Sequence, residues 1–156
     1  MNLYDELLCE AEKNGVEVRE HSFKCLRLKG LYTDNVITLN PTAIGSSVEK
    51  TCVLAEELGH FHTSFGNILN QSDIRNRKQE LRARSWAYER VVSLPAIVQA
   101  HQLGIRNRFE LAEHLGVTEE FLGAALKRFQ EKYGLCVPVG KYTVCFDPLG
   151  VIEYFD

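Results

Sequence analysis

The stretch CVLAEELGHFH, residues 52–62, decides how the rest of the chain is interpreted. Apolar residues recur in it at helical spacing, which predicts a helix with one buried face. Ser46 precedes this stretch and Glu49 follows Ser46 by three residues, the pattern of a capping box at a helix N-terminus. We therefore expect a helix that begins after Ser46. Its apolar positions are Val53, Leu54, Leu58 and Phe61.

Two acidic residues and a histidine lie on this predicted helix. Glu56 and His60 are four residues apart and share a face, and Glu57 points about 100° further round. In the H-E-x-x-H helix of metallopeptidases, two such ligands flank a metal and the intervening Glu polarises a water molecule. Here the first ligand position holds Glu56, and a carboxylate can replace an imidazole on zinc or favour a harder divalent ion. The competing interpretation is a solvated helix face.

A second helix can supply a third ligand. Glycine inside a helix costs about 1 kcal/mol relative to alanine. Its presence at position 59 therefore indicates that another backbone comes close there. Residues 79–95, QELRARSWAYERVVSLP, are again helical in pattern and carry Glu80 near their start. Antiparallel packing would bring Glu80 to Glu56 and His60, giving the three protein ligands of a catalytic zinc site.

These two blocks, LAEELGHFHTSFGNI and QELRARSWAYERVVSLP, resemble the ImmA/IrrE family of metallopeptidases. Family members usually read H-E-L-G-H, then E-x-x-A-x-x-F-A and a Leu-rich stretch ending in Pro. The departure is Glu56, and the resemblance implies a branch associated with phages and mobile elements that carries E-E-L-G-H. The matching residues of the second block are Glu80, Ala83, Trp86 (in place of Phe), Ala87 and Pro95.

The resemblance implies a zinc-dependent endopeptidase, with Mn²⁺ or another divalent ion as alternatives. Glu56, His60 and Glu80 would hold the metal, and Glu57 would be the catalytic residue that activates water. The implied substrate is a helix-turn-helix repressor of a phage or mobile element, whose cleavage releases gene expression. The alternative is a regulatory or protein-binding module that keeps the peptidase fold but cuts nothing.

Length, composition and charge are those of a globular protein that does not bind membranes or nucleic acid through a broad basic surface. At 156 residues, with 45% hydrophobic and 25% charged residues, the chain is typical of a single globular domain. A net charge of −3 gives no broad basic surface for nucleic acid or membrane. We expect neither a signal peptide nor a membrane span, and hence a cytoplasmic protein. The five cysteines are scattered without a C-x-x-C pair, which favours reduced thiols.

The region before residue 46 predicts a helix and a small sheet. A helix capped by Asn2 is closed by Asn14-Gly15, and residues 16–23 alternate as a strand. Residues 31–39 predict a hairpin with a tight turn at Asp34-Asn35. The expected fold is α+β and zincin-like, with a small, mostly antiparallel sheet and a helical bundle that carries the metal-site helix.

Residues 63–77 are polar and predict a loop at the rim of the site. His62 points away from the Glu56/His60 face and has little chance of binding the metal. If the helix has ended before His62, this residue is a candidate for stabilising the reaction's oxyanion; Tyr32 and Tyr88 are further candidates.

The C-terminal third changes in character. After a short helix at 96–103, residues 104–134 predict a helix-turn-helix-like segment, with two short helices joined at Gly116. Acidic and basic residues balance in this segment, so we do not expect DNA binding. Similar segments occur in ImmA/IrrE proteins, and the resemblance implies a packing or partner-docking role. Residues 135–156 predict terminal strands. We interpret residues 1–103 as the metal-site core and residues 1–156 as one domain.

Overall fold

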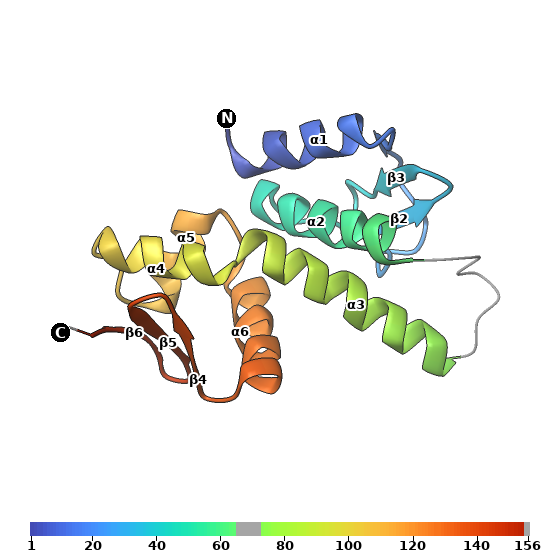
Figure 1. Ribbon diagram of the computed structural model, residues 1–156. Helices are drawn as coiled ribbons and strands as arrows, with labels where there is room; N and C mark the ends of the chain where they lie inside the picture. Colours follow the sequence, from blue (N-terminus) through green and yellow to red (C-terminus); the bar gives the residue numbers. More distant parts are fainter. Residues whose placement is uncertain (65–72, 155–156) are drawn as a thin grey trace. The chain divides into compact units, whose positions relative to one another are not determined.

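The computed structural model describes residues 1–64 and 73–154 (Figure 1). Within these ranges the fold is mixed α+β, with helices and two three-stranded sheets. The chain divides into two compact units, Met1–Ala87 and Tyr88–Asp156. The interpretation of the chain as one domain stays a prediction. None of the helices in the described residues is long and apolar enough to cross a membrane.

The first unit contains α1 (Leu3–Lys13), β1 (Glu17–Glu20), β2 (Gly30–Thr33), β3 (Val36–Leu39), α2 (Ser47–Thr63) and most of α3 (Asp73–Val91). The Asn2 side chain accepts a hydrogen bond from the Asp5 amide at 2.8 Å, so the predicted cap of the first helix is confirmed. Leu7 and Ala11 form the buried face of α1.

The sheet of the first unit has the order β1-β3-β2. Strands β2 and β3 pair antiparallel across Asp34 and Asn35, which both have positive φ, so the predicted tight turn is confirmed. Strand β1, however, pairs parallel to β3. The expectation of a mostly antiparallel sheet is therefore wrong here. Strand β2 of the hairpin pairs with one edge of β3, and β1 pairs with the other edge. A long connection, residues 21–29, joins β1 to β2.

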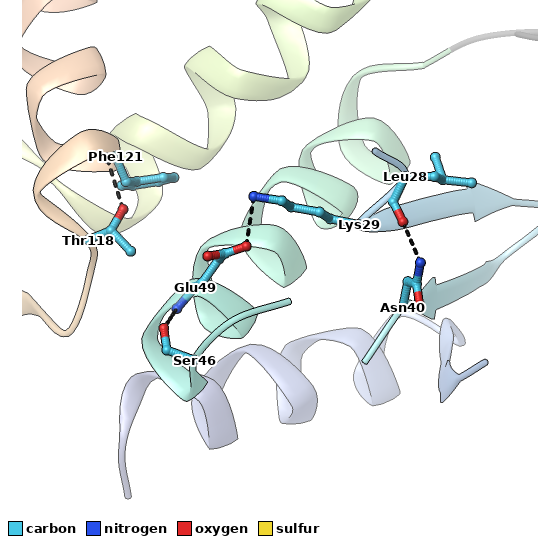
Figure 2. A network of polar contacts seen from close by, with 7 residues as sticks. All are labelled: Leu28, Lys29, Asn40, Ser46, Glu49, Thr118 and Phe121. Atoms are coloured by element: carbon cyan, nitrogen blue, oxygen red, sulfur yellow. Dashed lines mark hydrogen bonds and ion pairs between the residues drawn. The ribbon is translucent and has the colours of Figure 1, made fainter. Parts of the chain in front are cut away.

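Asn40 fixes that connection, residues 21–29. Its side chain is fully buried and donates a hydrogen bond to the carbonyl group of Leu28 at 2.8 Å (Figure 2). It also donates to the carbonyl group of Cys25 at 3.4 Å. Its side-chain oxygen accepts from the amides of Phe23 and Thr42. One buried amide thus satisfies three backbone groups of the connection and the amide of Thr42, as buried polar groups require.

The start of α2 has the predicted N-cap but not the full capping box, because the Glu49 carboxylate pairs with Lys29. The Ser46 hydroxyl oxygen accepts from the Glu49 amide at 3.1 Å, which confirms the predicted N-cap (Figure 2). The Glu49 carboxylate forms an ion pair with Lys29 at 2.8 Å, joining α2 to the residue before β2.

Helix α3 is longer than predicted. It begins at Asp73, so residues 73–77 of the predicted loop are helical, while residues 65–72 of that loop lie outside the described residues. It ends at Val91, and α4 (Leu94–Gln102) follows with Ser93 as N-cap and Pro95 in its first turn. Proline is tolerated there because the first amides of a helix have no intrahelical partner.

The second unit packs helices against an antiparallel sheet. It contains α4, α5 (Arg108–Leu115), α6 (Glu119–Tyr133), β4 (Cys136–Val139), β5 (Tyr142–Phe146) and β6 (Leu149–Glu153). Gly116 adopts a left-handed conformation between α5 and α6, and Thr118 caps α6 by accepting from the Phe121 amide (Figure 2). A helix-turn-helix function for this pair stays a prediction. The core includes Phe121, Leu122, Leu126, Phe129, Val144 and Phe146.

Two of the five cysteines are joined. Cys136 and Cys145 are direct partners on β4 and β5 and form a disulfide, whereas Cys9, Cys25 and Cys52 form no disulfide with any cysteine of the described residues. The expectation that all five cysteines are reduced is wrong for this pair. The two cysteines are nine positions apart in the sequence, and only the pairing of the two strands places them face to face.

Candidate functional site

Helices α2 and α3 touch at Gly59. A Cβ atom added to Gly59 would overlap the carbonyl group of Ala83, since the carbonyl carbon would lie only 2.8 Å away. Contacts between real Cβ atoms and other groups are essentially never so short. The expectation that another backbone comes close at Gly59 is thus confirmed. The absence of a side chain lets the two predicted ligand-bearing helices come into backbone contact.

This contact brings His60 and Glu80 together. His60 Nε2 lies 2.9 Å from Glu80 Oε1, and the His60 side chain is largely buried whereas that of Glu80 is half-exposed. Arg84, one turn further along α3, lies 3.6 Å from the other Glu80 oxygen. Arg84 was not among the predicted site residues, although its i,i+4 spacing from Glu80 is the sequence signal that could have identified it.

Glu57 lies against the first residue of strand β2. A Cβ atom on Gly30 would be 3.0 Å from Glu57 Cγ and 3.1 Å from Glu57 Oε1. In the order β1-β3-β2 this strand is at the edge of the sheet. Glu57 is therefore held between helix α2 and an edge strand, a contact that nothing in the local sequence signals.

The carboxyl groups of Glu56 and Glu57 are in an unfavourable environment for negative charge. Burial raises the pKa of Glu57 to about 7; the charge of His60 opposes this rise, and those of Glu80 and Glu56 add to it. Burial also raises the pKa of Glu56, against the opposing effect of Arg84. A carboxyl group with a pKa near neutrality can take up and return a proton.

The contact between His60 and Glu80 favours the charged form of both side chains. The hydrogen bond from His60 lowers the pKa of Glu80. Burial tends to lower the pKa of His60, but the bond to Glu80 and the charges of Glu57 and Glu56 outweigh it, so the pKa of His60 is raised. The cluster thus holds more carboxylate than cationic groups, which favours a bound cation.

The types of donor present, carboxylate and imidazole, suit a divalent cation, but the three side chains do not surround one common position. Two donors on facing helices, His60 Nε2 and Glu80 Oε1, already point at one another. Glu56 is electrostatically coupled to both. Among the described residues, no group of three His, Cys, Asp or Glu side chains is arranged as a metal site. His60 Nδ1 is buried without a hydrogen-bond partner.

Aromatic contacts surround His62, next to this cluster in the sequence. Its ring stacks on Trp86 with centroids 4.4 Å apart and meets the edge of Phe61. Trp86 is the residue that replaces the family's usual Phe. Tyr32 packs on Phe61 and donates to the Asn35 side chain at 3.3 Å, whereas Tyr88 packs on Phe121 in the second unit. Helix α2 continues to Thr63, so the helix has not ended before His62 and the condition for its suggested oxyanion role is not met. The role suggested for Tyr32 and Tyr88 stays a prediction.

Comparison with protein-family models gives one match, to a peptidase family described as the IrrE N-terminal-like domain, over residues 11–127. Searches of curated proteins and of solved structures gave no match. The matched region contains both helices of the candidate site, and a metallopeptidase family of this kind implies a divalent metal. With three quarters of its length covered by the family model, the chain belongs to the family of IrrE N-terminal-like peptidase domains.

Proposed function

We propose that this protein is a metal-dependent endopeptidase. Glu56, His60 and Glu80 would hold a divalent ion, zinc first and manganese as an alternative, and Glu57 would be the general base. The observation that carries the proposal is the 2.9 Å contact between His60 of α2 and Glu80 of α3, with Glu57 buried beside it. Membership of the peptidase family supports the same activity.

The chain's own residues have separate tasks in the proposed reaction. A divalent ion bound here would polarise a water molecule and the scissile carbonyl group. Glu57 accepts a proton from the attacking water and returns it to the leaving amine. Arg84 holds Glu80 in place through its charge. The edge of β2, where Gly30 contacts Glu57, can pair with an extended peptide.

The proposed substrate is a helix-turn-helix repressor encoded near the protein. This part of the proposal rests on the resemblance to ImmA-type peptidases, which release expression of a phage or mobile element. Such an enzyme is selective, so we expect no digestion of casein.

Metal content tests the ligand set. Elemental analysis of the purified protein should give about one zinc or manganese per chain, lost in both His60→Ala and Glu80→Ala. His114→Ala and Glu113→Ala, which alter the same residue types on α5, are the matched controls and should retain the metal. Absence of metal from the wild type after reconstitution would contradict the proposal.

Cleavage tests the role of Glu57. With candidate repressors from neighbouring genes as substrates, Glu57→Gln should keep metal and repressor binding but lower the cleavage rate by about 10²–10⁴-fold, the usual contribution of general acid–base catalysis. Glu113→Gln should cleave like the wild type. Cleavage by Glu57→Gln at the wild-type rate would rule out the assigned base.

A second candidate function is a regulator that binds the same repressor without cutting it. It is favoured by Glu56 at the first ligand position and by the lack of a converged three-donor group in the described residues. Repressor binding without cleavage by metal-loaded wild-type protein would support this alternative.

A further inference from the structure

The second unit contains a half-open cavity of about 230 Å³. Its walls are mainly apolar and come from three elements: Ile97 of α4, Leu111 of α5, and Leu149 and Val151 of β6. None of these residues belongs to the proposed metal and catalytic set. A cavity below the roughly 300–1,000 Å³ of drug-sized sites suits only a compact ligand.

The connection between α4 and α5 lines one side of this cavity. Gly104 has a φ of +89°, which lets the chain reverse after α4. The Ile105 amide then donates back to the Ala100 carbonyl at 3.0 Å. This reversal places Ile105 and Arg106 in the cavity wall together with His101 of α4.

Arg106 supplies a positive charge at this apolar cavity. The Arg106 guanidinium Nη1 donates to His101 Nδ1 at 2.8 Å and lies 3.4 Å from the His101 carbonyl oxygen. The Glu110 carboxylate accepts from the Arg106 backbone amide at 3.3 Å and forms no ion pair with the guanidinium. The remaining guanidinium N–H groups have no acceptor in the described part of the chain. His101 therefore fixes the orientation of the guanidinium, and the other N–H groups of the guanidinium remain able to donate to a ligand.

We propose that this cavity binds a small ligand with a compact apolar body and one carboxylate. The apolar body would lie against Ile97, Leu111 and Val151, and the carboxylate would accept the unused N–H groups of Arg106. Guanidinium is the side chain best matched to a carboxylate because its planar fork allows two parallel hydrogen bonds. The proposal does not depend on the peptidase activity.

Ligand charge is tested by NMR titration of the full chain with benzoate and with benzamide, which has nearly the same shape but no charge. Benzoate should shift the amide signals of Ala100, Leu111 and Val151 and bind about tenfold or more tightly than benzamide, as expected for a charge-assisted hydrogen bond. No shifts at these positions, or equal affinity for the two probes, would overturn the proposal.

Two pairs of variants locate the binding. Arg106→Gln should lower the affinity for benzoate about tenfold and leave the affinity for benzamide unchanged. Arg108→Gln is the control: it removes the same charge two residues further along, at a residue that does not line the cavity, and should change neither affinity. Val151→Phe should abolish binding of both probes. Ile152→Phe is its control, because successive strand residues face opposite sides and Ile152 is exposed. Retained benzoate affinity in Arg106→Gln would contradict the assigned carboxylate partner.

Discussion

The two compact units bury different kinds of side chain. In the described residues of Met1–Ala87 the interior includes the polar side chains of Asn40, Thr51 and His60. Buried residues in the described part of Tyr88–Asp156 are aliphatic or aromatic. Polar groups are costly to bury unless each finds a partner, whereas an apolar core needs only good packing. The first unit should therefore be sensitive to changes in specific contacts, and the second to loss of volume.

The largest stability effect should come from the core of the second unit. Phe129 is 1% exposed and packs against Phe146. Phe129→Ala should lower the free energy of unfolding by about 3–5 kcal/mol, because it removes buried surface and leaves a cavity. Urea denaturation measures the loss. Phe109→Ala, at a side chain that is 61% exposed, is the control and should change stability by about 0.5 kcal/mol or less.

Replacing the glycine inside α2 or the one inside α6 by alanine should change the free energy of unfolding in opposite directions. Gly59→Ala forces a methyl group into the Ala83 carbonyl and should cost up to about 3 kcal/mol, the usual upper range for overpacking. Gly123→Ala meets only the flexible end of the Arg108 side chain and should gain up to about 1 kcal/mol from helix propensity. Thermal unfolding of both variants measures this difference. Equal effects would mean that the α2–α3 contact is not as close as described.

Loss of the buried amide of Asn40 should cost about 1–3 kcal/mol. Asn40→Ala removes the partners of backbone groups in residues 21–29, and unsatisfied buried groups carry that penalty. Hydrogen exchange should show faster exchange of the Phe23 amide in particular. Asn107→Ala, which removes an exposed helix cap instead, should leave that amide protected.

The smallest effects should be the same in both units. Ser46→Ala and Thr118→Ala each remove one N-cap and should cost about 1 kcal/mol, because capping depends on local geometry and not on the surrounding core. Chemical denaturation provides the test. A cost several times larger for Ser46→Ala would show that the start of α2 also depends on the neighbouring Glu49–Lys29 pair.

Local signals in the sequence were sufficient for several elements. Asp34-Asn35, Ser46 and Gly59 each require a particular backbone geometry, and each occurs where that geometry was expected. The helix start at Asp73 was missed because the first residues of α3 lack apolar periodicity. The parallel pairing of β1 with β3 and the Cys136–Cys145 pair depend on contacts between strands, which residue spacing does not encode.

The candidate site was predictable in part for the same reason. Two helices joined at Gly59 were enough to anticipate that His60 and Glu80 would meet, although their roles stay predictions. The contact between Gly30 and Glu57 could not be anticipated, because it depends on how Asn40 folds the connection before β2.

The two edges of the first sheet have consequences for self-association. Strand β1 reads EVRE, and charged residues on an edge discourage the addition of a further strand. Strand β2 reads GLYT and carries no charge. Association of copies at high protein concentration should therefore occur at β2, next to Glu57. A second copy paired with this edge would then compete with any extended substrate for the same strand.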